Sequence, residues 1–239
     1  MKYFRRCAMA STALLLVAAA ACQGDRESSA TEDTAPPPST PELGLPTGWE
    51  VRLDRPGDDP SGVEFTSSEP GYHVQTGPAG ILFNSALSVS DEFHTAATIV
   101  QTTPTQHGEA YGIFVGGKNL EDDTQSYLYF LIREDGKFLI KRRSGAETSP
   151  IQAWTEHAAI ALRPEGGEAP ENTLRIDAGS ETVVFSINGA EVARLARAEV
   201  DVDGVAGFRV NHGLDLSITN FEVIPALPTE STKPESRSS

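Results

Sequence analysis

The sequence is poor in cysteine, in basic residues and in helical patterns, and each shortage narrows what the protein can be. It holds only 2 cysteines in 239 residues, Cys7 and Cys22, both near the N-terminus. A cysteine-based zinc site or a thiol nucleophile in the rest of the chain is therefore excluded. A disulfide is excluded as well if the segment that contains Cys7 is removed, as we predict below.

Basic residues are outnumbered, with 19 lysines and arginines against 34 aspartates and glutamates and a net charge of −15. Nucleic acid and anionic lipid headgroups repel such a protein, so neither is an expected partner. The five histidines are scattered without metal-site spacing, and no metal is expected. Acidic loops at 121–123 and 201–204 leave calcium open, although neither has the EF-hand pattern and an Asp-Gly turn explains the second equally well. We therefore expect no cofactor, with calcium as the alternative.

An apolar run follows a basic start at the N-terminus. Lys2, Arg5 and Arg6 precede the mostly apolar run 7–21, which ends in alanines. The run is short for a transmembrane helix, which needs about 20 apolar residues. A basic start, a short apolar stretch and small residues before a cut site predict a secretory signal peptide over residues 1–21.

The end of this segment, Ala-Ala-Ala-Cys, resembles the lipobox of bacterial lipoproteins, in which the cysteine carries lipid. The resemblance implies that Cys22 is the lipidation site and that the protein lies in the bacterial cell envelope, held to a membrane by its lipid. Gln23 stands where an aspartate retains some bacterial lipoproteins at the inner membrane. We therefore expect attachment to the outer membrane, facing the periplasm or the cell surface.

Two segments without many large apolar residues flank the middle of the chain. Residues 22–48 and 225–239 are rich in proline, serine, threonine and charged residues. They are too polar to offset their ordering entropy by burial, so we expect a disordered tether and a disordered tail. Residues 49–224, between them, are long enough for one domain with a substantial core.

Alternation of apolar and polar residues dominates this domain, and no long stretch has helical periodicity. The runs 126–133 and 137–143 flank Asp135-Gly136, a strong short-range signal for a β-hairpin. Further runs flank the turn dipeptides 188–189 and 212–213 in the same way. About 11 to 13 short strands at regular spacing predict an all-β fold, a two-sheet antiparallel jelly-roll β-sandwich.

Several of these runs resemble strands of the concanavalin A-like lectin/glucanase superfamily. The run 110–117, AYGIFVGG, is similar to the Gly-Ile-Phe strand of that family, and 135–138 is similar to its central hairpin. The runs 172–176, 184–189 and 204–210 resemble its last strands. Within the superfamily the chain is most similar to the domain of unknown function related to 3-keto-disaccharide hydrolases. The resemblance implies two stacked sheets, one of them curved, with sugars bound on the curved sheet or its rim. It says little about activity, because proteins with this sandwich fold have many different functions.

Aromatic and basic side chains of the expected curved sheet are the candidate ligand-binding residues. Such a sheet presents side chains at period two, and aromatic rings there can stack on the apolar faces of sugars. Alternation places Leu128, Phe130 and Ile132 on the core face of their strand. The predicted groove comprises Tyr111, Tyr127, Tyr129, Arg133, Arg142 and Arg209. The alternative is that the tyrosines pack between the sheets with their hydroxyls at the edge.

No motif marks a catalytic pair. A glycosidase needs two carboxyl groups about 5 Å or about 6.5–9.5 Å apart, and the Glu-x-Asp-x-x-Glu run of the laminarinase-like branch is absent. Glu109, Glu134 and Glu156 are the catalytic candidates, and surface salt bridges explain each of them as well. The sequence favours a lipid-anchored, non-catalytic module that binds a glycan or another envelope ligand. Two alternatives stay open: a glycoside hydrolase acting on a (keto-)disaccharide or other glycan, and a structural or assembly protein that binds a protein partner.

Overall fold

The computed structural model describes residues 44–226. The predicted signal peptide, the Cys22 lipidation site and almost all of the predicted tether and tail lie outside the described residues. Within residues 44–226, no helix has the length and apolar character needed to cross a membrane.

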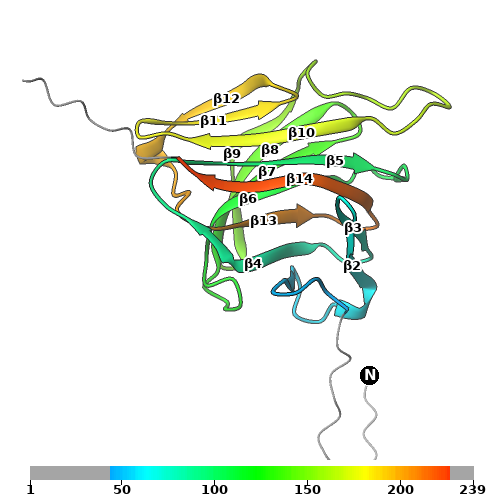
Figure 1. Ribbon diagram of the computed structural model, residues 1–239, viewed down its shortest axis with the longest axis horizontal. Helices are drawn as coiled ribbons and strands as arrows, with labels where there is room; N and C mark the ends of the chain where they lie inside the picture. Colours follow the sequence, from blue (N-terminus) through cyan, green and yellow to red (C-terminus); the bar gives the residue numbers. More distant parts are fainter. Residues whose placement is uncertain (1–43, 227–239) are drawn as a thin grey trace, which may run out of the picture. The chain divides into compact units, whose positions relative to one another are not determined.

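Two seven-stranded antiparallel sheets form the fold (Figure 1). Sheet A consists, in spatial order, of β1 (Glu50–Leu53), β4 (Gly80–Val89), β13 (Gly204–Val210), β6 (Ala110–Lys118), β7 (Ser126–Arg133), β8 (Lys137–Ser144) and β9 (Glu147–Glu156). Sheet B consists of β12 (Ala190–Ala196), β11 (Thr182–Ile187), β10 (Glu171–Ala178), β5 (Phe93–Gln101), β14 (Asp215–Pro225), β3 (Gly71–Thr76) and β2 (Val63–Ser68). Two 3-10 turns, η1 (Pro60–Gly62) and η2 (Arg197–Glu199), complete the elements. The predicted all-β, two-sheet jelly-roll sandwich is confirmed.

Two of the predicted hairpins are present, and each has a glycine in its turn. Gly136 between β7 and β8 and Gly189 between β11 and β12 have φ angles of +79° and +80°, in the left-handed region that glycine tolerates. The fourteen strands of residues 44–226 exceed the expected 11 to 13, and β9 is one that the sequence does not signal. Most of its residues are exposed, it lies at the edge of sheet A, and it contains Pro150. An edge strand that buries so little has hardly any apolar alternation to detect.

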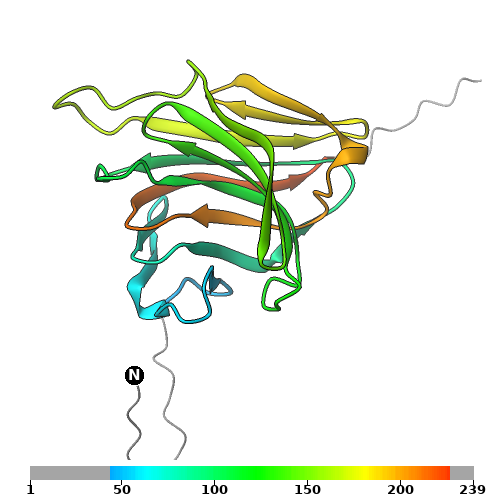
Figure 2. The same ribbon diagram turned by 180° about the vertical axis from the view of Figure 1, so that it is seen from behind.

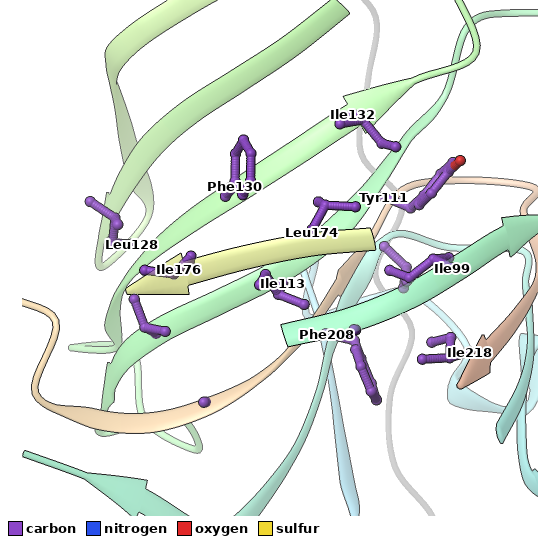
Figure 3. Close-up of a cluster of buried hydrophobic side chains, with 14 of the residues drawn as sticks. Ile99, Tyr111, Ile113, Leu128, Phe130, Ile132, Leu174, Ile176, Phe208 and Ile218 are labelled. Carbon is purple, nitrogen blue, oxygen red and sulfur yellow. The ribbon is translucent and has the colours of Figure 1, made fainter. Parts of the chain in front are cut away.

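The main core lies between the two sheets. Leu128, Phe130 and Ile132 of β7 meet Leu174 and Ile176 of β10 there, as Figure 3 shows, and each of these five is at most 1% exposed. Burying each large apolar side chain contributes about 1.5–3 kcal/mol. The prediction that Leu128, Phe130 and Ile132 face the core is confirmed.

Sheet A also buries much of its other face, which we call the outer face; it lies toward the viewer in Figure 2. The buried side chains there, the outer cluster, are Ile81, Phe83, Ala110, Phe114, Leu120, Tyr127, Tyr129, Leu131 and Leu139. Leu120 comes from the loop between β6 and β7 and packs onto the sheet. Gly207 makes room for the ring of Phe114, since a Cβ at Gly207 would lie only 2.7 Å from that ring. The middle of the outer face is therefore filled by side chains rather than open as a groove.

Candidate functional site

A cleft of about 700 Å³ lies beside the outer cluster, and we call it the arginine cleft. Its walls are β1 with the turn that follows it, the β6–β7 loop, and the turn between β8 and β9. Arg52, Asp54, Asp123, Gln125 and Arg143 are among the residues that line it. The cleft therefore combines segments from the beginning and the middle of the domain.

Asp54 and Arg143 form what we call the floor of the arginine cleft, and Asp54 also binds Arg209, which does not line the cleft. Its Oδ2 accepts a hydrogen bond from Arg209 Nη2 at 2.6 Å, and its Oδ1 accepts one from Arg143 Nη1 at 3.3 Å. The side chains of Arg209 and Arg143 are 9% and 10% exposed, whereas that of Asp54 is 26% exposed. Arg209 Nη1 also donates to two backbone carbonyls, and Arg143 Nε donates to one. These bonds fix both guanidinium groups before any ligand arrives, which lowers the entropic cost of binding.

Tyr127 and Tyr129 pack against these arginines from within the outer cluster. Burial raises the pKa of Tyr127 to about 12, against the opposing effect of the positive charges of Arg209 and Arg143. Burial also raises the pKa of Tyr129, and the guanidinium carbon of Arg209 lies 5.8 Å from its ring centre. The two tyrosines are only 3% and 5% exposed, so neither ring offers a face on which a sugar can stack. Instead, Tyr129 lies beside Arg209, and Tyr127 lies beside Arg143 across the strand pair β7–β8.

A smaller polar pocket, of about 200 Å³, lies between the sheets at one end of the sandwich, and we call it the end pocket. Tyr111, Arg133 and Glu134 line it together with Gln101 and residues of the segment 161–172. Figure 3 shows the Tyr111 hydroxyl pointing away from the labelled core side chains. Burial, followed by the negative charge of Glu134, raises the pKa of Tyr111 to about 12. Ligand sites usually enclose about 300–1,000 Å³, so this pocket is small for one.

The six predicted ligand-binding residues, Tyr111, Tyr127, Tyr129, Arg133, Arg142 and Arg209, lie in three places rather than in one groove. Tyr127, Tyr129 and Arg209 surround Asp54, whereas Tyr111 and Arg133 line the end pocket. Arg142 stands apart and donates from Nη2 to the Glu199 carbonyl at 2.7 Å. Tyr111 and Arg142 lie on the core-facing side of sheet A, opposite to Tyr127, because alternation within β6 and β8 puts them there. The alternative prediction placed the candidate tyrosines between the two sheets. Of the three, Tyr111 packs there, whereas Tyr127 and Tyr129 lie on the outer face.

The three catalytic candidates have separate partners. Glu134 Oε1 accepts from Thr105 Oγ1 at 2.9 Å in the wall of the end pocket. Glu156 Oε1 lies 3.7 Å from Lys137 Nζ and its side chain is 79% exposed, as in a surface salt bridge. Glu109 Oε2 lies 3.9 Å from His212 Nδ1. Among the described residues, none of these three carboxylates lines the arginine cleft.

The two acidic loops are engaged by basic side chains. Asp123 pairs with Arg52, Asp201 with Lys118, and Asp203 with Arg197. Over residues 44–226, no three or more histidine, cysteine, aspartate or glutamate side chains gather as they would around a metal ion.

Sequence reasoning missed Asp54, Arg143 and Arg52. Asp54 is separated from Arg143 by 89 residues and from Arg209 by 155, so no local pattern connects them. One signal was available for Arg143. Alternation along β8 puts it, and not Arg142, on the same side of sheet A as Tyr127, its cross-strand neighbour.

No family model matches the sequence, and no curated protein does. Solved structures do match. The carbohydrate-binding module CBM66 from Bacillus subtilis has a TM-score of 0.55 at 12% identity, covering 74% of this chain and 96% of that one. A GH16 protein of the Bacteroides ovatus mixed-linkage glucan locus has a TM-score of 0.52 at 10% identity, covering 74% of this chain and 94% of that one.

A Bacillus subtilis protein of unknown function with a galectin-like fold has a TM-score of 0.50 at 12% identity, covering 75% of this chain and 90% of that one. The chain shares the jelly-roll fold of these proteins. A jelly roll is the fold that the resemblance to concanavalin A-like strands implies. Identities this low show the fold alone, because one sandwich hosts many functions.

Proposed function

We propose that this protein binds a carbohydrate in the arginine cleft without cleaving it, as a lectin-like module of the bacterial cell envelope. The prearranged pair of Asp54 and Arg143 in the cleft, with Arg209 bound to the same carboxylate, is the observation that carries the proposal. A sugar hydroxyl both donates and accepts hydrogen bonds. A carboxylate beside guanidinium groups offers the matching acceptor and donors, in a cleft of about 700 Å³. That volume falls within the range of about 300–1,000 Å³ typical of ligand sites.

The fold supports a sugar ligand. Two of the similar structures are a carbohydrate-binding module and a GH16 protein in complex with a product. Hydrolysis has less support, since it needs two facing carboxyl groups, one of them kept protonated by an apolar environment. Of the three carboxylates that line the arginine cleft, Asp123 is fully exposed, Asp58 is only half-buried, and Asp54 is held by two arginines. Binding without catalysis therefore fits the cleft better than the hydrolase suggested by the 3-keto-disaccharide resemblance.

The proposed place of action follows from the N-terminal segment. A signal peptide over 1–21 and a lipid on Cys22 would hold the domain at the outer membrane, behind a long polar tether. Envelope polysaccharides would then be within reach of the arginine cleft.

Glycan-array binding followed by isothermal titration with the purified protein tests the proposal. We expect at least one glycan to bind, and Arg143→Gln to weaken that binding at least tenfold, because it removes donors at the floor of the cleft. Arg194→Gln is the matched control, since Arg194 pairs with Glu191 on β12 of sheet B. An array without any bound glycan contradicts the proposal, and so does equal weakening by the two substitutions.

A further inference from the structure

We infer that the glycan bound in the arginine cleft carries an anionic group, a carboxylate or a sulfate ester. This inference rests on the proposed carbohydrate binding and specifies its ligand class. It follows from the bonding of Asp54, which lines the cleft, to Arg209 as well as to Arg143, in a protein whose net charge is −15.

Two arginines share the Asp54 carboxylate: Arg143, which lines the cleft, and Arg209, which does not. The side chains of Arg143 and Arg209 are nine-tenths buried or more, and Asp54 is the acid that binds both. The adjacent Tyr127 and Tyr129 are neutral at physiological pH, as phenols ordinarily are, and burial raises the pKa of both further. They therefore add no negative charge. Because a desolvated charge is costly unless it is paired, the surplus positive charge favours an incoming anion.

The walls of the cleft do not cancel this surplus. Their charged residues are Arg52, Arg55, Asp58 and Asp123, two of each sign. The Arg52 Nη2 to Asp123 Oδ1 distance is 3.4 Å, and the Asp123 side chain is fully exposed. Such exposed ion pairs are weak, so a ligand anion can take the place of Asp123 at Arg52. The Nε atom of Arg52 is buried and has no hydrogen-bond partner among the described residues.

Donors suited to an anion remain at the floor. Arg143 uses Nε for the Gly145 carbonyl and Nη1 for Asp54. Its Nη2 makes no hydrogen bond within the described part of the chain, and Arg143 lines the cleft. A carboxylate or sulfate oxygen accepts short, charge-assisted hydrogen bonds from a guanidinium group. Arg143 at the floor and Arg52 on the wall are therefore the residues that we assign to the anionic group.

The test uses an array of matched pairs: oligogalacturonate with its carboxyl-reduced form, and sulfated galactans with their desulfated forms. We expect binding to be at least tenfold stronger for the charged member of a bound pair, and to weaken several-fold between 50 and 500 mM NaCl, as screening predicts. The pair that binds tells a carboxylate from a sulfate. Arg143→Gln and the more exposed Arg52→Gln should each remove most of the charged preference, whereas Arg194→Gln should leave it unchanged.

Equal binding of the charged and neutral members would overturn the anionic inference and leave the proposed carbohydrate binding in place. An array on which nothing binds would overturn both. If Arg143→Gln fails to fold, Arg52→Gln decides alone, and an unchanged charged preference in that variant overturns the assignment.

Discussion

Removal of Asp54 is the sharpest test of how the arginine cleft is built. In Asp54→Ala, Arg143 and Arg209 lose their shared carboxylate while their side chains stay 10% and 9% exposed. Removing one partner from a buried ion pair typically costs about 3–5 kcal/mol of stability. Asp54 itself is 26% exposed. Water therefore reaches part of the site, and we expect a loss at the lower end, about 3 kcal/mol.

Urea unfolding followed by tryptophan fluorescence measures this loss. Trp49 is a suitable reporter because it is 7% exposed and its ring centre lies 5.3 Å from that of Phe208 in the main core. The midpoint should fall while the m-value stays constant, since the surface exposed on unfolding is unchanged. Glu191→Ala is the control, because the Glu191–Arg194 pair lies on the surface, and it should leave the midpoint almost unchanged, since exposed ion pairs contribute little. Equal losses in the two variants would refute the reasoning about the floor.

Three further predictions concern other parts of the molecule. Gly207→Ala should lower the free energy of unfolding in urea by about 1–3 kcal/mol. The added Cβ would lie 2.7 Å from the Phe114 ring and 2.4 Å from the Leu82 carbonyl oxygen. The control is Gly57→Ala, which should be neutral because the space around Gly57 is open. Burial raises the pKa of Asp215, but hydrogen bonds from Thr102 and His73 outweigh it and leave the pKa lowered from 3.8. Asp215 therefore contributes stability above about pH 4 that is lost as the pH falls through the folded-state pKa. Asp215→Asn should flatten acid unfolding in that range, and an unchanged acid transition would contradict it. Mass spectrometry should find lipid on the N-terminal peptide of the wild-type protein and none on Cys22→Ala, and a lipid-free wild-type peptide would refute the anchor.

Only part of the candidate site could be predicted from the sequence. Alternation correctly separates Tyr127 and Tyr129 from Leu128, because one strand fixes which side chains share a face. It does not reveal that the tyrosines are buried, since Leu120, which helps to fill that face, comes from a different loop. The inclusion of Arg142 in place of Arg143 conflicts with the same alternation, and the structure places Arg143 beside Asp54.

The sequence by itself determined the all-β class, the Asp135-Gly136 and Asn188-Gly189 hairpins, and the core face of β7. These features depend on turn geometry and side-chain period, which act over a few neighbouring residues. Only the tertiary structure decided that β4 lies between β1 and β13, which brings Asp54 to Arg209 across 155 residues. Pairing of distant strands depends on how two whole sheets bury their apolar faces together, and no short stretch of sequence contains that information.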